Sequence, residues 1–111
     1  MHPDVAGILE NHSDGIRSKY LAMRLLLMGS VDVAVEERVW AKLPSYYVGE
    51  SFVRLIPFMD HINVEAKYIS QHKDELVDYA ITPKGMLQIH SNQELPADTL
   101  ECVFRKTLCE E

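Results

Sequence analysis

The stretch from residue 36 to residue 63 constrains the fold most, because its apolar runs, prolines and turns are typical of a β-meander. Over residues 31–39, which overlap the start of this stretch, valines alternate with mostly polar residues. This is the period of a strand with one buried face. Pro44 lacks a backbone donor, so we expect the strand to stop or bulge there. Gly49-Glu50 and Asp60-His61 are the predicted turns. The strands expected from these signals are residues 31–39, 46–48, 52–59 and 62–65.

Helical periodicity flanks the meander on both sides. Apolar residues recur at helical spacing over residues 16–29, and the glycine that ends this run suits a left-handed helix cap. The same spacing predicts a middle helix over residues 67–79 and a last helix that begins at Pro96, with a short strand at residues 86–90 between them. We therefore predict an α+β fold and a single domain over residues 1–111. Its antiparallel sheet, a four-strand meander plus a fifth short strand, packs against N-terminal, middle and C-terminal helices.

The composition is that of an ordinary globular domain: 111 residues, 47% of them hydrophobic, with a formal net charge of −6. The negative charge argues against nucleic-acid binding, which needs a basic surface. Neither a bilayer-spanning apolar run nor the pattern of a secretory signal is found, so we expect a cytoplasmic protein with no membrane partner. We expect the protein to be a monomer or a homodimer. Cys102 and Cys109 lack a metal or redox spacing and are expected on the exposed side of the last helix.

Standard catalytic motifs are missing from the sequence. The five glycines do not have the spacing of a dinucleotide- or phosphate-binding loop, and neither His-Glu-x-x-His nor Gly-x-Ser-x-Gly occurs. Spacing alone assembles no set of nucleophile, base and orienting group. We therefore expect that the protein is not an enzyme.

Aromatic residues concentrate in the meander. Trp40, Tyr46 and His61 are predicted to line a groove beside the Pro44 irregularity, together with Lys84, as the site of a small-molecule or protein-binding module. The alternative is that these aromatic residues belong to the core, as aromatic residues of strands usually do. For His61 the alternative is an imidazole that caps the turn or packs on an aromatic ring.

Carboxylates supply the candidate metal ligands. Asp32, Glu36 and Glu37 offer the oxygen atoms that hard cations prefer, and the alternative is the solvated surface of an acidic protein. His72 and Glu75 lie one turn apart on the predicted middle helix, a geometry that suits a shared metal ion. The alternative for this pair is a partly buried helix surface.

A family resemblance is carried by Trp40 with Pro44 and by the segment over residues 79–90, Tyr-Ala-Ile-Thr-Pro-Lys-Gly-Met-Leu-Gln-Ile-His, followed by Leu95-Pro96. Over residues 35–108 the chain resembles the YdhG-like family, a domain of unknown function. The resemblance implies an antiparallel sheet packed against helices, similar to the frataxin-like fold.

The resemblance also implies a function. Some members of the YdhG-like family are regarded as intracellular iron chaperones that donate iron for iron–sulfur cluster or haem assembly. It thus implies iron as the bound ion and iron–sulfur or haem assembly proteins as partners. Frataxins use surface carboxylates of the first helix and an adjoining strand, and the candidates here are Asp32, Glu36 and Glu37. Our first hypothesis is a non-enzymatic YdhG-like protein that binds iron weakly, and the second is the aromatic binding module.

Overall fold

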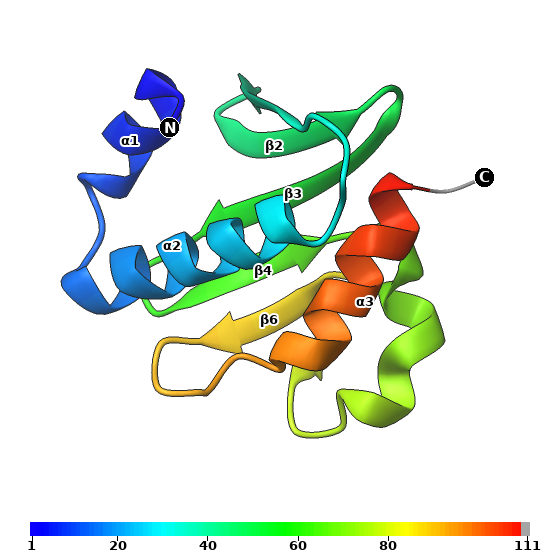
Figure 1. Ribbon diagram of the computed structural model, residues 1–111. Helices are drawn as coiled ribbons and strands as arrows, with labels where there is room; N and C mark the ends of the chain where they lie inside the picture. Colours follow the sequence, from blue (N-terminus) through cyan, green and yellow to red (C-terminus); the bar gives the residue numbers. More distant parts are fainter. Residues whose placement is uncertain (110–111) are drawn as a thin grey trace.

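The computed structural model describes residues 1–109 and has two layers, a six-stranded antiparallel sheet and the helices that pack against it (Figure 1). The helices are α1 (Pro3–Leu9), α2 (Asp14–Gly29), the 3-10 helix η1 (Lys67–Glu75) and α3 (Ala97–Leu108). The strands are β1 (Glu36–Trp40), β2 (Leu43–Val48), β3 (Ser51–Pro57), β4 (His61–Glu65), β5 (Ala80–Ile81) and β6 (Leu87–His90). The predicted α+β class is confirmed. Within residues 1–109, no helix is both long enough and apolar enough to cross a membrane.

Antiparallel pairing joins the strands in the order β1-β2-β3-β4-β6-β5. Strands β1 to β4 are neighbours in sequence and in space, which confirms the predicted meander. The predicted fifth strand is β6, which pairs with β4 so that His61 lies opposite His90. The two-residue strand β5 was not expected from the sequence, and it forms an edge of the sheet beside β6.

The first strand begins later than the valine pattern predicts. β1 starts at Glu36, and Val33, inside the predicted strand, is 51% exposed. The reason is the length of the partner strand. Glu36 pairs with Tyr47, and β2 ends one residue later at Val48, where the chain turns into β3, so residues before Val35 have no strand to pair with.

Pro44 does not interrupt the sheet, so the predicted break is wrong. It lies inside β2 and pairs with Val39 of β1. Pairing between β2 and β3 begins only at Ser45, so Pro44 lies outside that ladder and its missing amide is tolerated. The chain instead reverses between β1 and β2 at a two-residue turn, Ala41-Lys42.

The Ala41-Lys42 turn adopts a backbone conformation that favours glycine. Both residues have positive φ, 49° and 66°, as a tight hairpin turn of the mirror-image type requires. We expect Lys42→Gly to raise the free energy of unfolding by about 0.5–1 kcal/mol, because the left-handed conformation is strained for a residue with a Cβ atom. Urea unfolding measures this. Lys42→Ala keeps the Cβ atom and is the control, and an equal gain in both variants would contradict the explanation.

The middle segment is a 3-10 helix rather than the predicted α-helix over residues 67–79. η1 ends at Glu75, and His72 inside it has non-helical angles, φ −120° and ψ 19°. A helix with three residues per turn places side chains three apart on one side. Ile69 and His72 accordingly are both buried, whereas Val77, an apolar residue within the predicted helix, is 78% exposed.

The core lies between the sheet and helices α2 and α3. Along each strand every second side chain points into it. Its largest fully buried residues come from the sheet, from α2 and α3, and from η1 and the residue that follows it: Ile16, Tyr20, Met23, Leu27, Tyr46, Leu55, Ile62, Ile69, Leu76, Leu87, Ile89 and Phe104. Because α3 buries its apolar stripe, Cys102 is only partly exposed and Cys109 is exposed, which confirms the orientation expected for the last helix.

Candidate functional site

The sheet has an outer face, on the side away from α2 and α3, where the side chains that alternate with the core residues are found (Figure 1). Strand pairing brings five of them into one cluster: Arg38, Trp40, Tyr47, Phe52 and Arg54. Trp40 is 58% exposed. The outer face thus presents aromatic rings and guanidinium groups, which are enriched in binding surfaces.

Stacked arginines hold the aromatic rings of the outer face in place. The Arg38 guanidinium lies 4.0 Å from the centre of the Tyr47 ring. Arg54 lies 4.1 Å from the Phe52 ring and 4.8 Å from the Trp40 ring. Each such contact contributes about 0.5–1 kcal/mol at an exposed site. The rings are therefore positioned before any ligand arrives.

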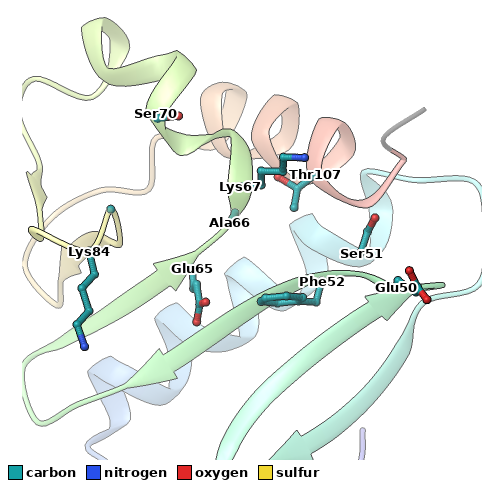
Figure 2. Close-up of a pocket in the computed structure, with 10 residues that line it drawn as sticks. Glu50, Ser51, Phe52, Glu65, Ala66, Lys67, Ser70, Lys84 and Thr107 are labelled. Atoms are coloured by element: carbon teal, nitrogen blue, oxygen red, sulfur yellow. The ribbon is translucent and has the colours of Figure 1, made fainter.

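A pocket of about 690 Å³ opens at one end of the outer face, where β4 ends and η1 begins (Figure 2). Figure 2 shows Phe52 and Glu65 on neighbouring strands, with Lys84 extending from the turn between β5 and β6 toward the same face. The remaining lining residues are Glu50, Ser51, Ala66, Lys67, Ser70, Gly85 and Thr107. The volume lies within the range of small-molecule sites, about 300–1,000 Å³.

Arg54 links the pocket to the aromatic cluster. Its Nη1 lies 3.3 Å from both carboxylate oxygens of Glu65, and its Nε donates a hydrogen bond to Ser45 Oγ at 3.1 Å. The Arg54 side chain is only 12% exposed. Arg54 thus neutralises the carboxylate of Glu65, so the negative charge of Glu65 in the pocket is paired.

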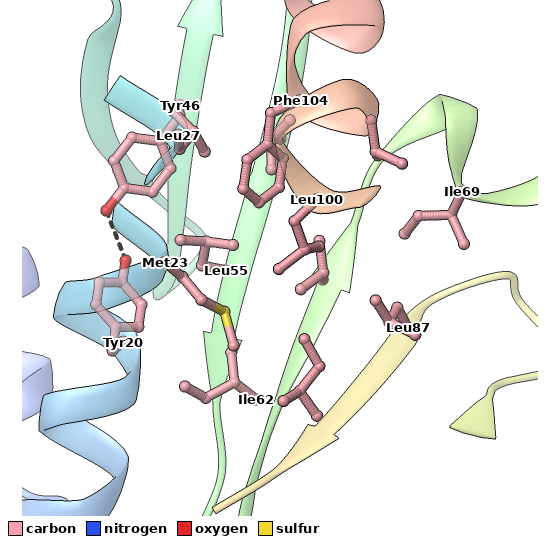
Figure 3. Packing of buried hydrophobic residues seen from close by; sticks show 14 of the residues in the cluster. Tyr20, Met23, Leu27, Tyr46, Leu55, Ile62, Ile69, Leu87, Leu100 and Phe104 are labelled. Atoms are coloured by element: carbon pink, nitrogen blue, oxygen red, sulfur yellow. Dashed lines mark hydrogen bonds between the residues drawn. The ribbon is translucent and has the colours of Figure 1, made fainter. Parts of the chain in front are cut away.

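The predicted binding residues do not come together in one groove. Of the four, Lys84 lines the pocket, and Trp40 is exposed on β1. Tyr46 is fully buried on the core side of β2, where its hydroxyl shares a 2.7 Å hydrogen bond with that of Tyr20 (Figure 3). His61 lies at the opposite end of β4 from the pocket. For Tyr46 the core alternative is confirmed, because the residue pairs with Val53, which also faces the core.

The predicted iron ligands are also separated. Glu36 and Glu37 are consecutive in β1 and point to opposite faces of the sheet. Glu36 is paired with Arg38 at 3.1 Å on the outer face, and Asp32 is exposed before the strand begins. The three carboxylates therefore do not form one oxygen-lined site.

Glu37 is part of a polar network at the edge of the core. Arg24 of α2 binds both of its carboxylate oxygens, at 2.6 and 3.1 Å, and the His2 amide donates to it at 2.6 Å. Burial alone would raise the pKa of Glu37, but hydrogen bonds from Arg24, the His2 amide and Tyr46 outweigh burial and lower the pKa from 4.5 to about 2. Burial raises the pKa of Tyr46. Glu37 is thus an ionised structural residue.

A histidine cluster at the other end of the sheet was not expected. Nitrogen and oxygen atoms of Asp60, His61 and His90 lie within 4.8 Å of one another, the one such group of metal-ligand residues found in residues 1–109. His61 Nδ1 lies 2.7 Å from Asp60 Oδ1, and this hydrogen bond lowers the pKa of Asp60. Sequence reasoning assigned His90 no role, because its contact with His61 depends on the register of strands β4 and β6.

The other predicted metal pair is engaged in local contacts. His72 is buried, with Nδ1 3.0 Å from Glu75 Oε1 and Nε2 3.3 Å from Lys106 Nζ of α3. Glu75 also accepts a hydrogen bond from Thr99 at 3.2 Å. Both imidazole nitrogens therefore have protein partners, and the pair joins η1 to α3.

Comparison with protein-family models, with curated proteins and with solved structures found no match. The class that the geometry defines is accordingly coarse: a small α+β domain with an aromatic, arginine-rich sheet face that ends in a pocket. The resemblance to the YdhG-like family, with the fold relationship and the iron role that it implies, stays a prediction.

Proposed function

We propose that the protein is a non-enzymatic binding module that takes a small organic anion in the pocket beside Phe52 and Lys84. The observation that carries this proposal is the 690 Å³ pocket at the end of the outer face. A concave site of this size with an aromatic wall and a few polar groups is the default place for a small ligand. The proposed site includes Lys84, as predicted from the sequence, but it is this pocket and not the predicted groove near Trp40 and His61.

Charge decides the class of ligand. Two lysines, Lys67 and Lys84, and two carboxylates, Glu50 and Glu65, line the pocket, and Arg54 pairs with Glu65 at 3.3 Å from outside the lining, in a chain whose formal net charge is −6. Because Arg54 already offsets Glu65, the exposed ammonium group of Lys84 is a positive group in a cleft of an acidic protein, which favours an anion. Lys84 supplies an exposed ammonium group for a carboxylate or phosphate, and Phe52 supplies an apolar surface for the rest of the ligand.

Benzoate is a suitable probe, because it joins one flat ring to one carboxylate. We expect saturable amide shifts at Phe52, Lys84 and Gly85 in an NMR titration, with a dissociation constant on the order of 1 mM for so small a ligand. Benzyl alcohol, which lacks the charge, should bind more weakly. Lys84→Gln should weaken benzoate binding at least about threefold, since one charge-assisted contact is lost.

Lys73→Gln is the matched control, because Lys73 is an exposed lysine of η1 that does not line the pocket. It should leave benzoate binding unchanged. Equal weakening by both lysine variants, or benzoate shifts that do not saturate or that lie away from Phe52, would refute the pocket as an anion site.

Iron binding at Asp32, Glu36 and Glu37 stays a prediction with less geometric support, because Arg24 already neutralises Glu37. The expected iron–sulfur or haem assembly partners depend on that prediction. A cytoplasmic location and a monomeric or homodimeric state are part of the proposal.

A further inference from the structure

We propose that Asp60, His61 and His90 form a binding site for a divalent transition-metal ion of the zinc and cobalt class. The site lies at the end of β4 that is remote from the proposed anion pocket, so it is independent of the proposed function. Two imidazoles and one carboxylate are a donor set that suits these ions, whereas calcium and magnesium prefer oxygen atoms alone.

Strand register creates the site. His61 opens β4 and His90 closes β6, and the two residues are direct partners in an antiparallel pair. Directly opposite residues project to the same face of the sheet with Cβ atoms about 4.5–5.5 Å apart. The imidazole rings follow, with centres 5.3 Å apart. Asp60, the residue before β4, adds its carboxylate to the same corner.

The spacing of the donor atoms is close to that of a loaded site. Bonds of about 2.0–2.1 Å in a tetrahedron place two ligand atoms about 3.4 Å apart. In the protein the three donor atoms lie within 4.8 Å of one another, and the Asp60–His61 pair is at 2.7 Å. Side-chain rotations that move the donor atoms by about 1 Å are therefore enough to surround an ion, and the strands need not move.

Neighbouring contacts position two of the three ligands, Asp60 and His61. The Asp60 carbonyl accepts a hydrogen bond from the Ser91 amide at 2.9 Å, which ties the β3–β4 turn to the end of β6. The Phe58 ring stacks on the His61 ring at 4.7 Å, and the Phe58 amide donates to the His61 carbonyl at 2.8 Å. Supporting contacts of this kind orient metal ligands and raise affinity.

Solvent reaches the cluster from one side. The Asp60 side chain is 71% exposed and that of His61 is 20% exposed. Three protein ligands then leave a fourth position for water or for an outside donor, as in zinc sites that keep an open coordination position. The expected ion is thus held at the surface rather than sealed inside the fold.

Cobalt absorption spectroscopy tests this site directly. Addition of Co²⁺ to the protein should produce visible d–d bands that saturate at one ion per chain, and Zn²⁺ should abolish them by competition. His61→Ala, His90→Ala and Asp60→Asn should each weaken Co²⁺ binding by at least about tenfold, since even loss of an outer contact to a ligand costs this much. Zinc-induced NMR shifts should lie at the ring resonances of His61 and His90.

His12→Ala is the matched control, because His12 is a histidine outside the cluster. It should leave the spectrum and the Co²⁺ affinity unchanged. Urea unfolding checks that each ligand variant is folded. If His90→Ala does not fold, His90→Gln replaces it in the Co²⁺ titration. The proposal is overturned if the ligand variants bind Co²⁺ as tightly as the wild type, or if zinc shifts other histidines and not these two.

Discussion

Replacing Glu37 by alanine is expected to lower the free energy of unfolding by about 3 kcal/mol, the lower end of the range for breaking a buried ion pair. The Glu37 side chain is 8% exposed and holds Arg24 at 2.6 Å. Its removal leaves the guanidinium and the His2 amide without their acceptor. The lower end of the range applies because Arg24 is itself 24% exposed and recovers some hydration.

Glu36→Ala is the control for this prediction. Glu36 is the preceding residue of the same strand and also pairs with an arginine, but its side chain is 63% exposed. Exposed pairs contribute little, so the change should be within about 0.5 kcal/mol. Similar losses at the two positions in urea unfolding would show that burial does not explain the role of Glu37.

The pH dependence separates the charge of Glu37 from its packing. Its pKa in the folded protein is about 2 and its ordinary value is 4.5. A lowered pKa means that the ionised carboxylate stabilises the fold fully above pH 4.5 and that this contribution is lost as the pH falls toward 2. The difference in unfolding free energy between wild type and Glu37→Ala should shrink over that interval. A constant difference would assign the effect to packing.

Replacing Phe104 by alanine is expected to lower the free energy of unfolding by about 4 kcal/mol. Phe104 is fully buried and points from α3 into the core between α2 and the sheet (Figure 3). Deletion of the ring loses its transfer free energy and leaves a cavity that the surrounding side chains fill only in part. Against a total stability of about 5–15 kcal/mol, such a loss removes a large fraction of the free energy of unfolding.

Phe58→Ala makes the same chemical change at a position that is 42% exposed. Its expected cost is well below half that of Phe104→Ala, because less apolar area leaves the protein interior. Denaturant unfolding of both variants measures the difference. Equal costs would mean that Phe104 is not packed as the structure describes.

The sequence predicted most where a pattern is local. Apolar runs and turn residues located strands β2, β3 and β4, and helical spacing located α2 and α3, because each signal lies within one element. The same reasoning failed at Ala41-Lys42, since neither residue is typical of a hairpin turn and the strain of positive φ is not visible in a pattern. β5 was missed because two residues are too few to show a period.

The candidate sites depended on contacts between distant segments, which no local pattern contains. Arg24 and Glu37 are 13 residues apart and belong to different elements, so no pattern within one element predicts their contact. His61 and His90 meet only through the pairing of β4 with β6. Lys84, predicted as a binding residue, lines the pocket, whereas Tyr46 lies in the core, because the face of a strand residue is decided by register.

Closure of the core by α3 has a consequence for synthesis of the chain. Leu100, Phe104 and Leu108 complete the layer over the sheet, and they belong to the last element described. Until α3 has left the ribosome, the part of the apolar sheet face that α3 covers stays exposed. During synthesis the nascent chain therefore exposes an apolar sheet surface for an interval, and a chaperone that binds apolar strands can bind it in that interval.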